Sequence, residues 1–447
     1  WTGENPADGE THVKAHARLV IIGGGISGCS LLYHLTKLGW TDVVLIEKDE
    51  LTSGSTWLAA GNIVQWAPDR CTSRLLQHSI SLYQSLEAET GQQTGWQTTG
   101  SLRLATTSDR MDEYRHVLSK DRALGIACSL VSAEEAKGLF PFMEADGVVG
   151  AMYHELDGHC DPAGTAMALA KGARHAGAEI YRSTRATDLS RTAGGEWVVH
   201  TEKGDITCEV VVNAGGLWAA RVGAMAGVFV PTIAIEHHHL LFEGLPDIEA
   251  LEDELISLRD PDVPFYLRRE GTGLLVGVYE AECRAWGADG VPWDWAQSDL
   301  PADLDRIQDY ILRTMDRVPM LQEAGLKHIC AGPIAYTPDG RQLLGPVGGV
   351  PNFYCIAGCN FGIAQAGGVG KYLAEWIVEG EPSIDLNSLD PRRFGDWTSK
   401  TYTFVKAHEA YRLQYQLAIP DTERDAGRPL KTPPIYDLQK AQGAVFG

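Results

Sequence analysis

The sequence contains no apolar run of the roughly 18 residues or more that a membrane-spanning helix requires. Its first sixteen residues are polar and lack the apolar stretch of a secretory signal. Basic residues are scarce, because 38 Lys and Arg stand against 59 Asp and Glu, for a net charge of −21. We therefore expect no membrane span and no nucleic acid or anionic membrane as a partner, since both attract surplus Lys and Arg.

Cysteine pairs with redox or zinc-finger spacing are also missing. The nine cysteines lie between Cys29 and Cys359, and the closest motif is the lone C-x3-C of Cys355 and Cys359. Such scatter is typical of reduced thiols and indicates an interior compartment, the cytoplasm or, in a eukaryote, the mitochondrial matrix. The chain begins at Trp1 instead of Met, so we expect a processed protein or a fragment.

The first structured segment is predicted to be a β-α-β unit. Residues 17–22 form an apolar strand, residues 29–38 have helical spacing, and a second strand over 42–46 ends at Glu47. Between the first strand and the helix, residues 23–28 (GGGISG) fit the pattern G-x-G-x-x-G. This pattern lets a pyrophosphate approach the N-terminus of the helix, and an acid after the second strand binds ribose hydroxyls. The unit therefore predicts dinucleotide binding by an α/β protein.

The rest of the chain mixes helices and strands, and a length of 447 residues predicts two or three structural units. Helical spacing is found over 73–90, 108–125, 161–177, 303–315 and 365–378. Strands over 207–212 and 353–357 each end in a glycine-rich turn, and residues 231–280 alternate as in an antiparallel sheet. Residues from 381 onward are rich in Pro, Asp and Arg and predict a connector or lid.

Several motifs resemble those of the flavoprotein amine dehydrogenases that include dimethylglycine and sarcosine dehydrogenases. They occur over nearly the whole chain, at 51–61, 157–162, 212–218, 266–268, 332–339 and 366–373. The resemblance implies an FAD-binding Rossmann-like domain of the glutathione-reductase type, interleaved with an antiparallel-sheet substrate domain. The expected boundaries are 1–16 for a leader, 17–100, 151–230 and 325–380 for the FAD-binding domain, 101–150 and 231–324 for the substrate domain, and 381–447 for the connector or lid.

The resemblance also implies which residues bind FAD. Three separate glycine-rich turns contacting one ligand favour FAD over the alternative, a nicotinamide cofactor. The implied contacts are Gly23, Gly25, Ile26, Ser27, Gly28, Glu47 and Lys48 at the diphosphate and ribose, Gly54, Ser55, Thr56, Trp57, Leu58, Ala60, Gly61 and Asn62 around the flavin, Ala186, Ala214, Gly215 and Trp218 along the dinucleotide, and Gly332, Asn360, Phe361, Gly362, Ile363, Ala364 and Gln365 near the isoalloxazine.

Two positions depart from the covalent flavin linkage of related proteins. The family attaches FAD to a histidine after Thr-Trp, where this chain has Leu58. Monomeric sarcosine oxidases use a cysteine whose place is taken by Gly332, with Cys330 two residues away. We therefore expect FAD to be bound without a covalent bond.

By the same resemblance, His237 and Tyr266 lie beside the substrate as the catalytic residues. In a strand, His237 and His239 share one face while His238 points away. No nearby acid or cysteine completes a metal ligand set, so no metal is expected. Plain structural roles are the alternative for His238 and His239, and a packed aromatic is the alternative for Tyr266.

A carboxylate-binding clamp is the least determined part of the site. Arg268, Arg269 and Arg341 are candidates, although exposed arginines commonly belong to a solvated surface. Gln365 replaces the lysine that binds the substrate carboxylate in monomeric sarcosine oxidase. The identity of the acid is therefore left open.

The implied function is FAD-dependent oxidative N-demethylation of a small N-methylated amino acid such as dimethylglycine or sarcosine. The products are an imine and then formaldehyde, and the electron acceptor is oxygen or a carrier flavoprotein or quinone. Two alternatives are a D-amino acid or glycine oxidase acting on a primary amine, and a flavin electron-transfer subunit without a substrate of its own.

The end of the chain, residues 427–447, resembles the linker that leads into a folate-binding domain. We therefore expect that the natural polypeptide continues, or that a separate subunit carrying tetrahydrofolate docks on residues 381–447. The alternative is a simple C-terminal arm that wraps the FAD domain or a neighbouring subunit.

Overall fold

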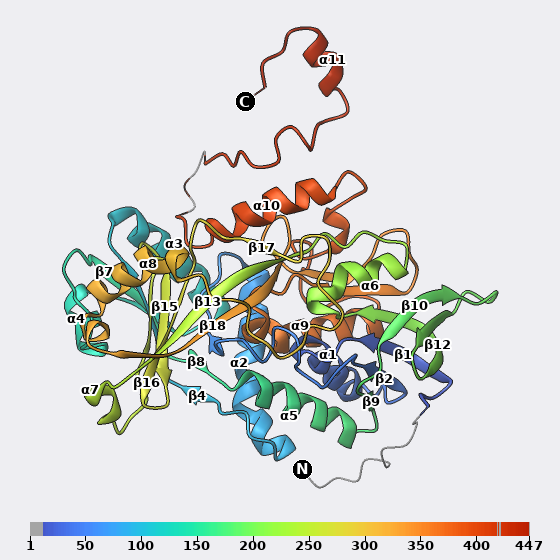
Figure 1. The fold of residues 1–447 in the computed structure, drawn as a ribbon, viewed down its shortest axis with the longest axis horizontal. Coiled ribbons are helices and arrows are strands. Elements are labelled where there is room, and N and C mark those ends of the chain that lie inside the picture. The colour runs from blue at the N-terminus through green and yellow to red at the C-terminus, as the bar shows by residue number, and fades with distance from the viewer. Residues whose placement is uncertain (1–11, 418, 420–421, 447) are drawn as a thin grey trace.

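A mostly parallel sheet forms one lobe of the protein, as the computed structural model of residues 12–417, 419 and 422–446 shows (Figure 1). Its parallel strands are β1 (His16–Ile22), β2 (Val43–Ile46), β9 (Glu179–Tyr181), β12 (Gly204–Asn213) and β20 (Phe353–Ala357). Every residue of β2 is buried, as expected for a parallel strand covered on both faces. The antiparallel strands β10 (Ala186–Arg191), β11 (Trp197–Thr201) and β19 (Leu343–Pro346) extend this sheet.

One layer of helices packs on this sheet. It consists of α1 (Ile26–Lys37), α5 (Pro162–His175) and α9 (Gly362–Glu379). Helix α2 (Arg70–Thr90) packs on α5 and α9, and the short helix α6 (Ala219–Met225) lies elsewhere on the lobe (Figure 1). Leu19, Leu31 and Leu373 belong to the shared core. The start of α5 is as predicted, because Asp161 accepts a hydrogen bond from the Ala163 amide at 3.0 Å and Pro162 opens the first turn.

A nine-stranded sheet forms the second lobe. Its strands run in the order β17 (Ala285–Trp286), β13 (Ile233–Glu243), β16 (Gly273–Val278), β15 (Phe265–Glu270), β14 (Ser257–Asp260), β5 (Ser101–Ala105), β7 (Gly150–His154) and β6 (Cys128–Val131), with β18 (Gly325–Tyr336) also on β13. All pairs are antiparallel except β14 with β5. The structure corrects the expected boundaries here, because β18 and β7 extend this sheet and do not join the FAD-binding lobe.

Smaller elements complete the fold. The helices of the second lobe are α3 (Ser108–Leu124), α4 (Ala133–Leu139), α7 (Pro246–Glu249) and α8 (Leu304–Arg317), and a three-stranded sheet joins β3 (Asn62–Ile63), β8 (Gly158–His159) and β4 (Gln97–Thr98). Single 3-10 turns are η1 (Gly216–Trp218), η2 (Pro319–Gln322) and η3 (Pro391–Arg393). Both lobes combine helices with a β-sheet, and this is the α/β class that the sequence predicts.

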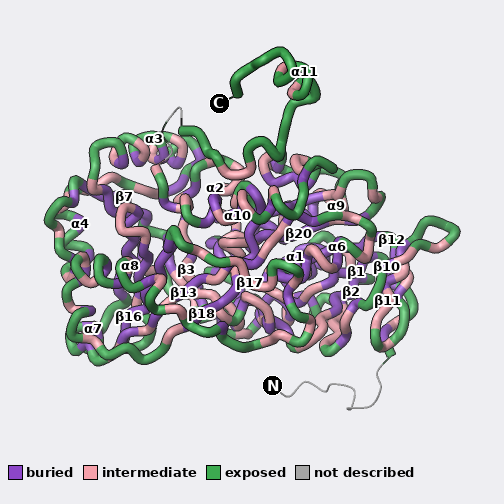
Figure 2. The backbone as a smooth tube through the Cα atoms, turned by 45° about the horizontal axis from the view of Figure 1, so that its top comes forward, coloured by how far each residue is buried: buried purple, intermediate pink, exposed green. Residues whose placement is uncertain are grey.

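The C-terminal segment divides into a packed part and an exposed arm. Helix α10 (Lys400–Arg412) lies over the middle of the molecule against β13 and β18, with Ala407 and Tyr411 fully buried (Figure 1). Residues 422–431 still contact the body, since the Ala426 amide donates to Glu409 of α10 and Lys431 lies over the Trp397 ring. Residues 432–446, with α11 (Tyr436–Ala441), extend away from the body and are mostly exposed (Figure 2). Part of the predicted connector or lid is therefore core structure.

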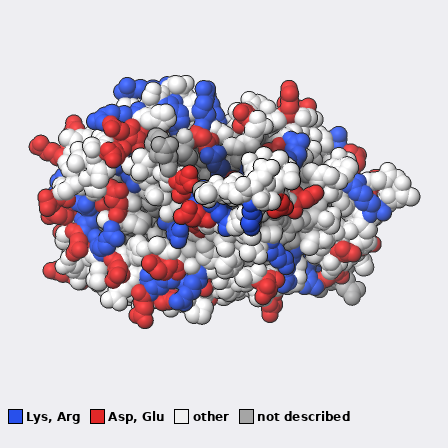
Figure 3. All heavy atoms as spheres, turned by 90° about the horizontal axis from the view of Figure 1, so that it is seen from above, with Lys and Arg blue, Asp and Glu red and all other residues white. Residues whose placement is uncertain are grey.

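Two surface properties agree with the composition. Across the described residues, no helix has the length and the apolar character needed to traverse a bilayer. On the face drawn in Figure 3, acidic and basic side chains are interspersed among neutral ones.

Candidate functional site

A cavity of about 620 Å³ lies between the two lobes and is lined by residues from both sheets. Its wall includes the β1–α1 turn, the 53–62 segment, strand β18 and the start of α9. A volume of this size matches a site for a cofactor with its substrate.

The β1–α1 turn provides the features that a pyrophosphate requires. Gly23 has a φ of +119°, and a Cβ on Gly28 would lie 2.0 Å from the Gly23 carbonyl oxygen, so both positions require glycine. The N-cap residue of helix α1, Gly25, offers no capping side chain, although Thr56 accepts from the Ile26 amide at 3.2 Å, and Gly25, Ile26 and Ser27 line the cavity. Uncapped N–H groups at a helix N-terminus bind phosphate oxygens, so this end of the cavity fits a dinucleotide.

Glu47 and Lys48, which are predicted to bind the diphosphate and ribose, both line the cavity. The Glu47 carboxylate accepts hydrogen bonds from the Gly24 amide at 2.7 Å and the Asp49 amide at 3.0 Å, which fixes it beside the turn. Burial raises the pKa of Glu47 despite these bonds. The Lys48 ammonium lies 4.3 Å from the centre of the Trp218 ring. Ala186 lines a small adjoining pocket together with these three residues.

The opposite end of the cavity fits a planar polar ring. Both polar atoms of the Asn62 side-chain amide are buried and have no hydrogen-bond partner among the described residues. Helix α9 starts at Gly362 without a side-chain cap, and residues 360–365 line the cavity beside Asn62. Unpaired donors and acceptors of this kind are costly unless a ligand bonds to them, so they support an isoalloxazine at this end.

The two positions at which related flavoproteins attach their cofactor meet in space. A Cβ on Gly332 of β18 would lie 2.9 Å from Cδ1 of Leu58, and neither residue carries a nucleophile. Cys330 also lines the cavity, and burial raises the pKa of its thiol, which disfavours the reactive thiolate. FAD held without a covalent bond stays a prediction.

The structure brings nearly all of the predicted cofactor residues to this cavity. Gly28 packs behind the turn, and Trp57, 36% exposed, lies outside the lining. The residues that line it are Gly23, Gly25, Ile26, Ser27, Glu47, Lys48, Gly54, Ser55, Thr56, Leu58, Ala60, Gly61, Asn62, Ala214, Gly215, Trp218, Gly332, Asn360, Phe361, Gly362, Ile363, Ala364 and Gln365. Their individual contacts with FAD stay predictions.

His237 and Tyr266 meet on the wall formed by the nine-stranded sheet. The Tyr266 hydroxyl lies 3.0 Å from Nε2 of His237, and both side chains are buried and line the cavity. His239 lines the cavity as well, whereas His238 faces the other side of the sheet and lies 3.3 Å from Arg306. The alternation expected for this strand is therefore present. Burial lowers the pKa of His237 well below its ordinary value, so its imidazole is neutral.

Strand pairing adds two arginines that the sequence did not single out. Arg103 pairs with Arg259 across β5 and β14, and Arg259 pairs with Tyr266 across β14 and β15. Both guanidinium groups are buried, at 6% and 7% exposure, and both line the cavity. Within the part of the chain that the structure describes, neither forms an ion pair. An arginine in an otherwise apolar strand, such as Arg103 between Leu102 and Leu104, was the available signal.

The predicted carboxylate clamp is wrong for two of its three members. Arg268 donates to the Ala60 carbonyl at 2.7 Å and forms an ion pair with Glu270. Arg269 bonds to backbone carbonyls, including that of Gly271 at 2.9 Å, and neither residue lines the cavity. Arg341 lines the cavity but is half exposed and lies 3.6 Å from Asp69. The guanidinium groups of Arg268 and Arg269 thus already bond to groups of the protein itself.

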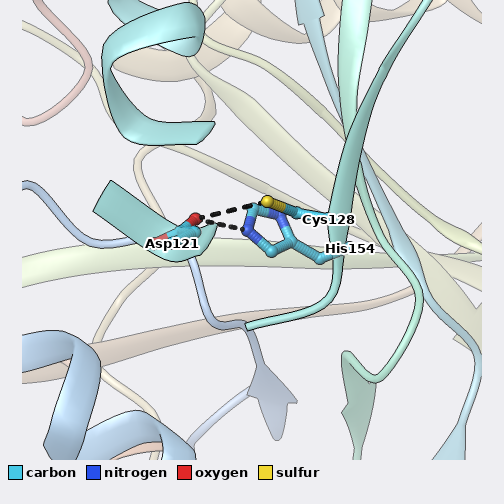
Figure 4. Close-up of side chains that lie close together, drawn as sticks. All are labelled: Asp121, Cys128 and His154. Carbon is cyan, nitrogen blue, oxygen red and sulfur yellow. Dashed lines mark hydrogen bonds and ion pairs between the residues drawn. The ribbon is translucent and has the colours of Figure 1, made fainter. Parts of the chain in front are cut away.

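One cluster outside the cavity has the residue types of a metal site, among the described residues (Figure 4). Asp121 lies 3.1 Å from Nε2 of His154 and 3.7 Å from the Cys128 sulfur. Lys120 occupies the other side of the same carboxylate, at 3.1 Å. Burial lowers the pKa of His154, but the hydrogen bonds to Asp121 and Cys128 and the nearby charge of Asp157 together outweigh it, and the pKa rises to about 9. Two cations already neutralise Asp121, so we interpret the cluster as a buried ion-pair network.

Comparison with known sequences identifies the family. The protein family described as "FAD dependent oxidoreductase" matches residues 18–376. The family described as "FAD dependent oxidoreductase central domain" matches residues 379–432. The chain belongs to the FAD-dependent oxidoreductases. FAD is therefore its cofactor, as predicted, and the cradle described above is where it fits.

Two relatives and one solved structure show how far the similarity extends. Human mitochondrial dimethylglycine dehydrogenase is 42% identical over 95% of this chain and 50% of its own length. Human mitochondrial sarcosine dehydrogenase is 36% identical over 96% of this chain and 47% of its own length. This chain thus spans about half the length of these relatives. The crystal structure of L-proline dehydrogenase from P. horikoshii superposes with a TM-score of 0.76 at 25% identity, over 86% of this chain and 98% of that one.

Proposed function

We propose that this chain oxidises a small N-methylated amino acid at the N-methyl carbon and so begins its demethylation. The observation that carries the proposal is the row of Arg103, Arg259 and Tyr266, which faces the FAD cradle from the substrate side of the cavity. The relatives named dimethylglycine dehydrogenase and sarcosine dehydrogenase support an N-methylated amine as the substrate class.

The buried arginine pair supports a substrate that carries a carboxylate. Burying a guanidinium without a partner is costly, and a carboxylate that bonds to both groups removes that cost. Arg103 lies 4.0 Å from the centre of the Trp66 ring, and Arg259 donates to the Tyr415 hydroxyl at 3.2 Å. These contacts hold the two cations in place before any ligand binds. Burial also lowers the pKa of Arg103.

The chemistry divides between the cofactor and the chain. When bound, FAD takes up the electron pair and the hydrogen of an N-methyl C–H bond, which leaves an iminium ion that water hydrolyses to formaldehyde and the demethylated amine. Tyr266 and His237 lie where they contact the amine, and the arginine pair orients its carboxylate. The electrons pass on to oxygen or to a carrier flavoprotein or quinone.

Anaerobic mixing with a panel of amines tests the proposal through bleaching of the bound flavin. Dimethylglycine and sarcosine should reduce the flavin and release formaldehyde, whereas glycine and D-alanine should not. Faster reduction by the primary amines would favour a glycine oxidase or D-amino acid oxidase. A flavin that no amine bleaches without a partner protein would favour an electron-transfer subunit.

Two matched pairs of variants separate site residues from their neighbours. Arg259→Gln should weaken dimethylglycine binding about 10- to 100-fold, the effect of losing a charged hydrogen bond. Arg269→Gln, whose side chain bonds to backbone away from the cavity, should not. N,N-dimethylethanolamine, which has no carboxylate, should bind equally to both variants. His237→Ala should slow flavin reduction about 100-fold or more, and His238→Ala should not.

The proposal also includes a folate partner and a compartment. The exposed arm over 432–446 gives such a partner a place to dock, and tetrahydrofolate would capture the carbon released as formaldehyde. Two experiments test this partner. The first is a pull-down from the source organism that looks for tetrahydrofolate-binding proteins attached to this chain. The second measures free formaldehyde with and without tetrahydrofolate. Formaldehyde release that tetrahydrofolate never changes would contradict it.

Both relatives named above are mitochondrial, which supports the mitochondrial matrix as the compartment in a eukaryote.

A further inference from the structure

Four hydrogen-bonded side chains lead from the cavity into the protein. The Tyr266 hydroxyl lies 3.0 Å from Nε2 of His237, and Nδ1 of His237 lies 2.9 Å from the Tyr411 hydroxyl. Tyr411 donates to the Glu280 carboxylate at 2.9 Å. Tyr266 and His237 line the cavity, whereas Tyr411, on α10, and Glu280, after β16, lie behind that wall. All four side chains are at most 7% exposed.

The carboxylate at the end of this chain sets the direction of every bond. A carboxylate only accepts, so the Tyr411 hydroxyl donates its one proton to Glu280. Tyr411 must then accept from Nδ1–H of His237, which leaves Nε2 without a hydrogen because the imidazole is neutral. Nε2 therefore accepts from Tyr266. The lone pairs of the Tyr266 oxygen are left facing the cavity, where they can accept a proton from an ammonium group.

We propose that Tyr411 and Glu280 form a proton relay that removes the ammonium proton of the substrate through Tyr266 and His237. This inference rests on the proposed function, since an amine is oxidised only in its neutral form. The Tyr266 oxygen gains the ammonium proton and passes its own to Nε2 of His237. Nδ1 of His237 releases a proton to Tyr411, and the Tyr411 proton moves to Glu280. The substrate loses one proton, the Glu280 carboxylate gains one, and no other group changes its charge.

The surroundings of Glu280 suit an acceptor that works near neutral pH. Burial raises the pKa of Glu280 to about 7, against the lowering effects of the Tyr411 hydrogen bond and the Arg306 charge. Nε of Arg306 lies 3.2 Å from Oε1 of Glu280, and the same guanidinium bonds to Glu236 at 2.7 Å. Glu236 is partly exposed and lies outside the chain of hydrogen bonds from Tyr266 to Glu280. The other titratable groups that face Glu280 are Cys283, Tyr310 and Tyr336.

The groups around His237 keep the relay in its neutral form. His238 and His239 lie next to it in β13 and lower its pKa further, after the larger effect of burial. The Tyr279 ring lies 4.6 Å from the imidazole ring, centre to centre, and covers it. An imidazole that gains a proton at Nε2 therefore releases the proton at Nδ1 to Tyr411 and stays neutral.

Flavin reduction by dimethylglycine, followed anaerobically over a range of pH, tests the relay with Tyr411→Phe and Glu280→Gln. Near neutral pH both variants should reduce the flavin about 100-fold more slowly than the wild type, a usual effect of losing acid-base catalysis. As the pH rises past the pKa of the amine, substrate arrives neutral and the variants should approach the wild-type rate. Glu236→Gln, which keeps the whole chain from Tyr266 to Glu280, is the control and should stay within a few-fold of wild type.

A second readout does not depend on turnover. Infrared spectra recorded during a pH titration should show a buried carboxylic acid that ionises near neutral pH in the wild type and in Glu236→Gln. That signal should be missing in Glu280→Gln. Flavin content and absorbance spectrum confirm that each variant is folded.

The results separate failure of the relay from failure of the proposed function. Rates that Tyr411→Phe and Glu280→Gln lower equally at every pH, or leave unchanged, would overturn the relay while dimethylglycine still bleaches the wild type. The same conclusion follows if no carboxyl signal depends on Glu280. If no amine reduces the wild-type flavin, the proposed function falls, and the relay falls with it.

Discussion

Replacing Gly277 with alanine should disconnect Tyr266 from His237. Gly277 of β16 pairs with Tyr266 of β15, and the tyrosine ring lies across the glycine. A Cβ at this position would lie 2.0 Å from Cζ of Tyr266, whereas carbon atoms in ordinary contact stay about 3.5 Å or more apart. The phenol end of the ring must therefore move by about 1.5 Å.

That displacement breaks the hydrogen bond from Tyr266 to His237, which is 3.0 Å long in the structure. Overpacking a core costs about 1–3 kcal/mol, and the lost hydrogen bond adds about 1 kcal/mol, so the free energy of unfolding should fall by about 2–4 kcal/mol. The rate of flavin reduction by substrate should fall further than FAD content, because the cradle at the β1–α1 turn lies on the other lobe.

Denaturant unfolding, bound FAD and the anaerobic rate of flavin reduction measure the three effects. Gly325→Ala is the matched control, since Gly325 lies in the same sheet and its added Cβ would meet only the Glu243 oxygen at 3.7 Å. In a Tyr266→Ala background the ring is gone, so Gly277→Ala should lower the free energy of unfolding much less than it does in the wild type. Equal effects of the two glycine variants, or an unchanged cost of Gly277→Ala without the ring, would refute the reasoning.

Three further predictions follow from the cavity and the ion-pair cluster. Acid precipitation should release all the flavin into the supernatant because Leu58 and Gly332 offer no linking atom; colour that stays in the pellet would contradict this. Glu47→Gln should weaken FAD retention by about 1–3 kcal/mol, the value of charged hydrogen bonds, and equal flavin content after dilution would count against the ribose contact. The pKa of His154 is raised to about 9, so its ion pair with Asp121 stabilises the fold below pH about 6.5, and this stabilisation is lost as pH rises through about 9. The wild type should lose about 3 kcal/mol of unfolding free energy over that range relative to His154→Gln, and parallel pH profiles would show that the pair contributes nothing.

Features that depend on residues adjacent in the chain could be predicted before the fold was known. The G-x-G-x-x-G turn, the strand before it and the helix after it are adjacent in the chain, so their pattern predicts the phosphate-binding end of the cavity. Side chains alternate between the two faces of a strand, so His238 was predicted to point away from the face that His237 and His239 share. Leu58 excluded one covalent linkage by its chemistry alone.

Which of the buried charges can bind a ligand depends on how distant segments pack together. Arg268 follows Tyr266 closely in sequence, yet the Ala60 carbonyl and Glu270 occupy its guanidinium. Arg103 enters the site only because β5 pairs with β14, which lies far along the chain. Tyr411 and Glu280 join His237 because α10 folds back over β13. Sequence distance does not reveal such pairings, because the hydrogen bonds and ion pairs that satisfy a buried charge come from whichever elements the fold packs around it.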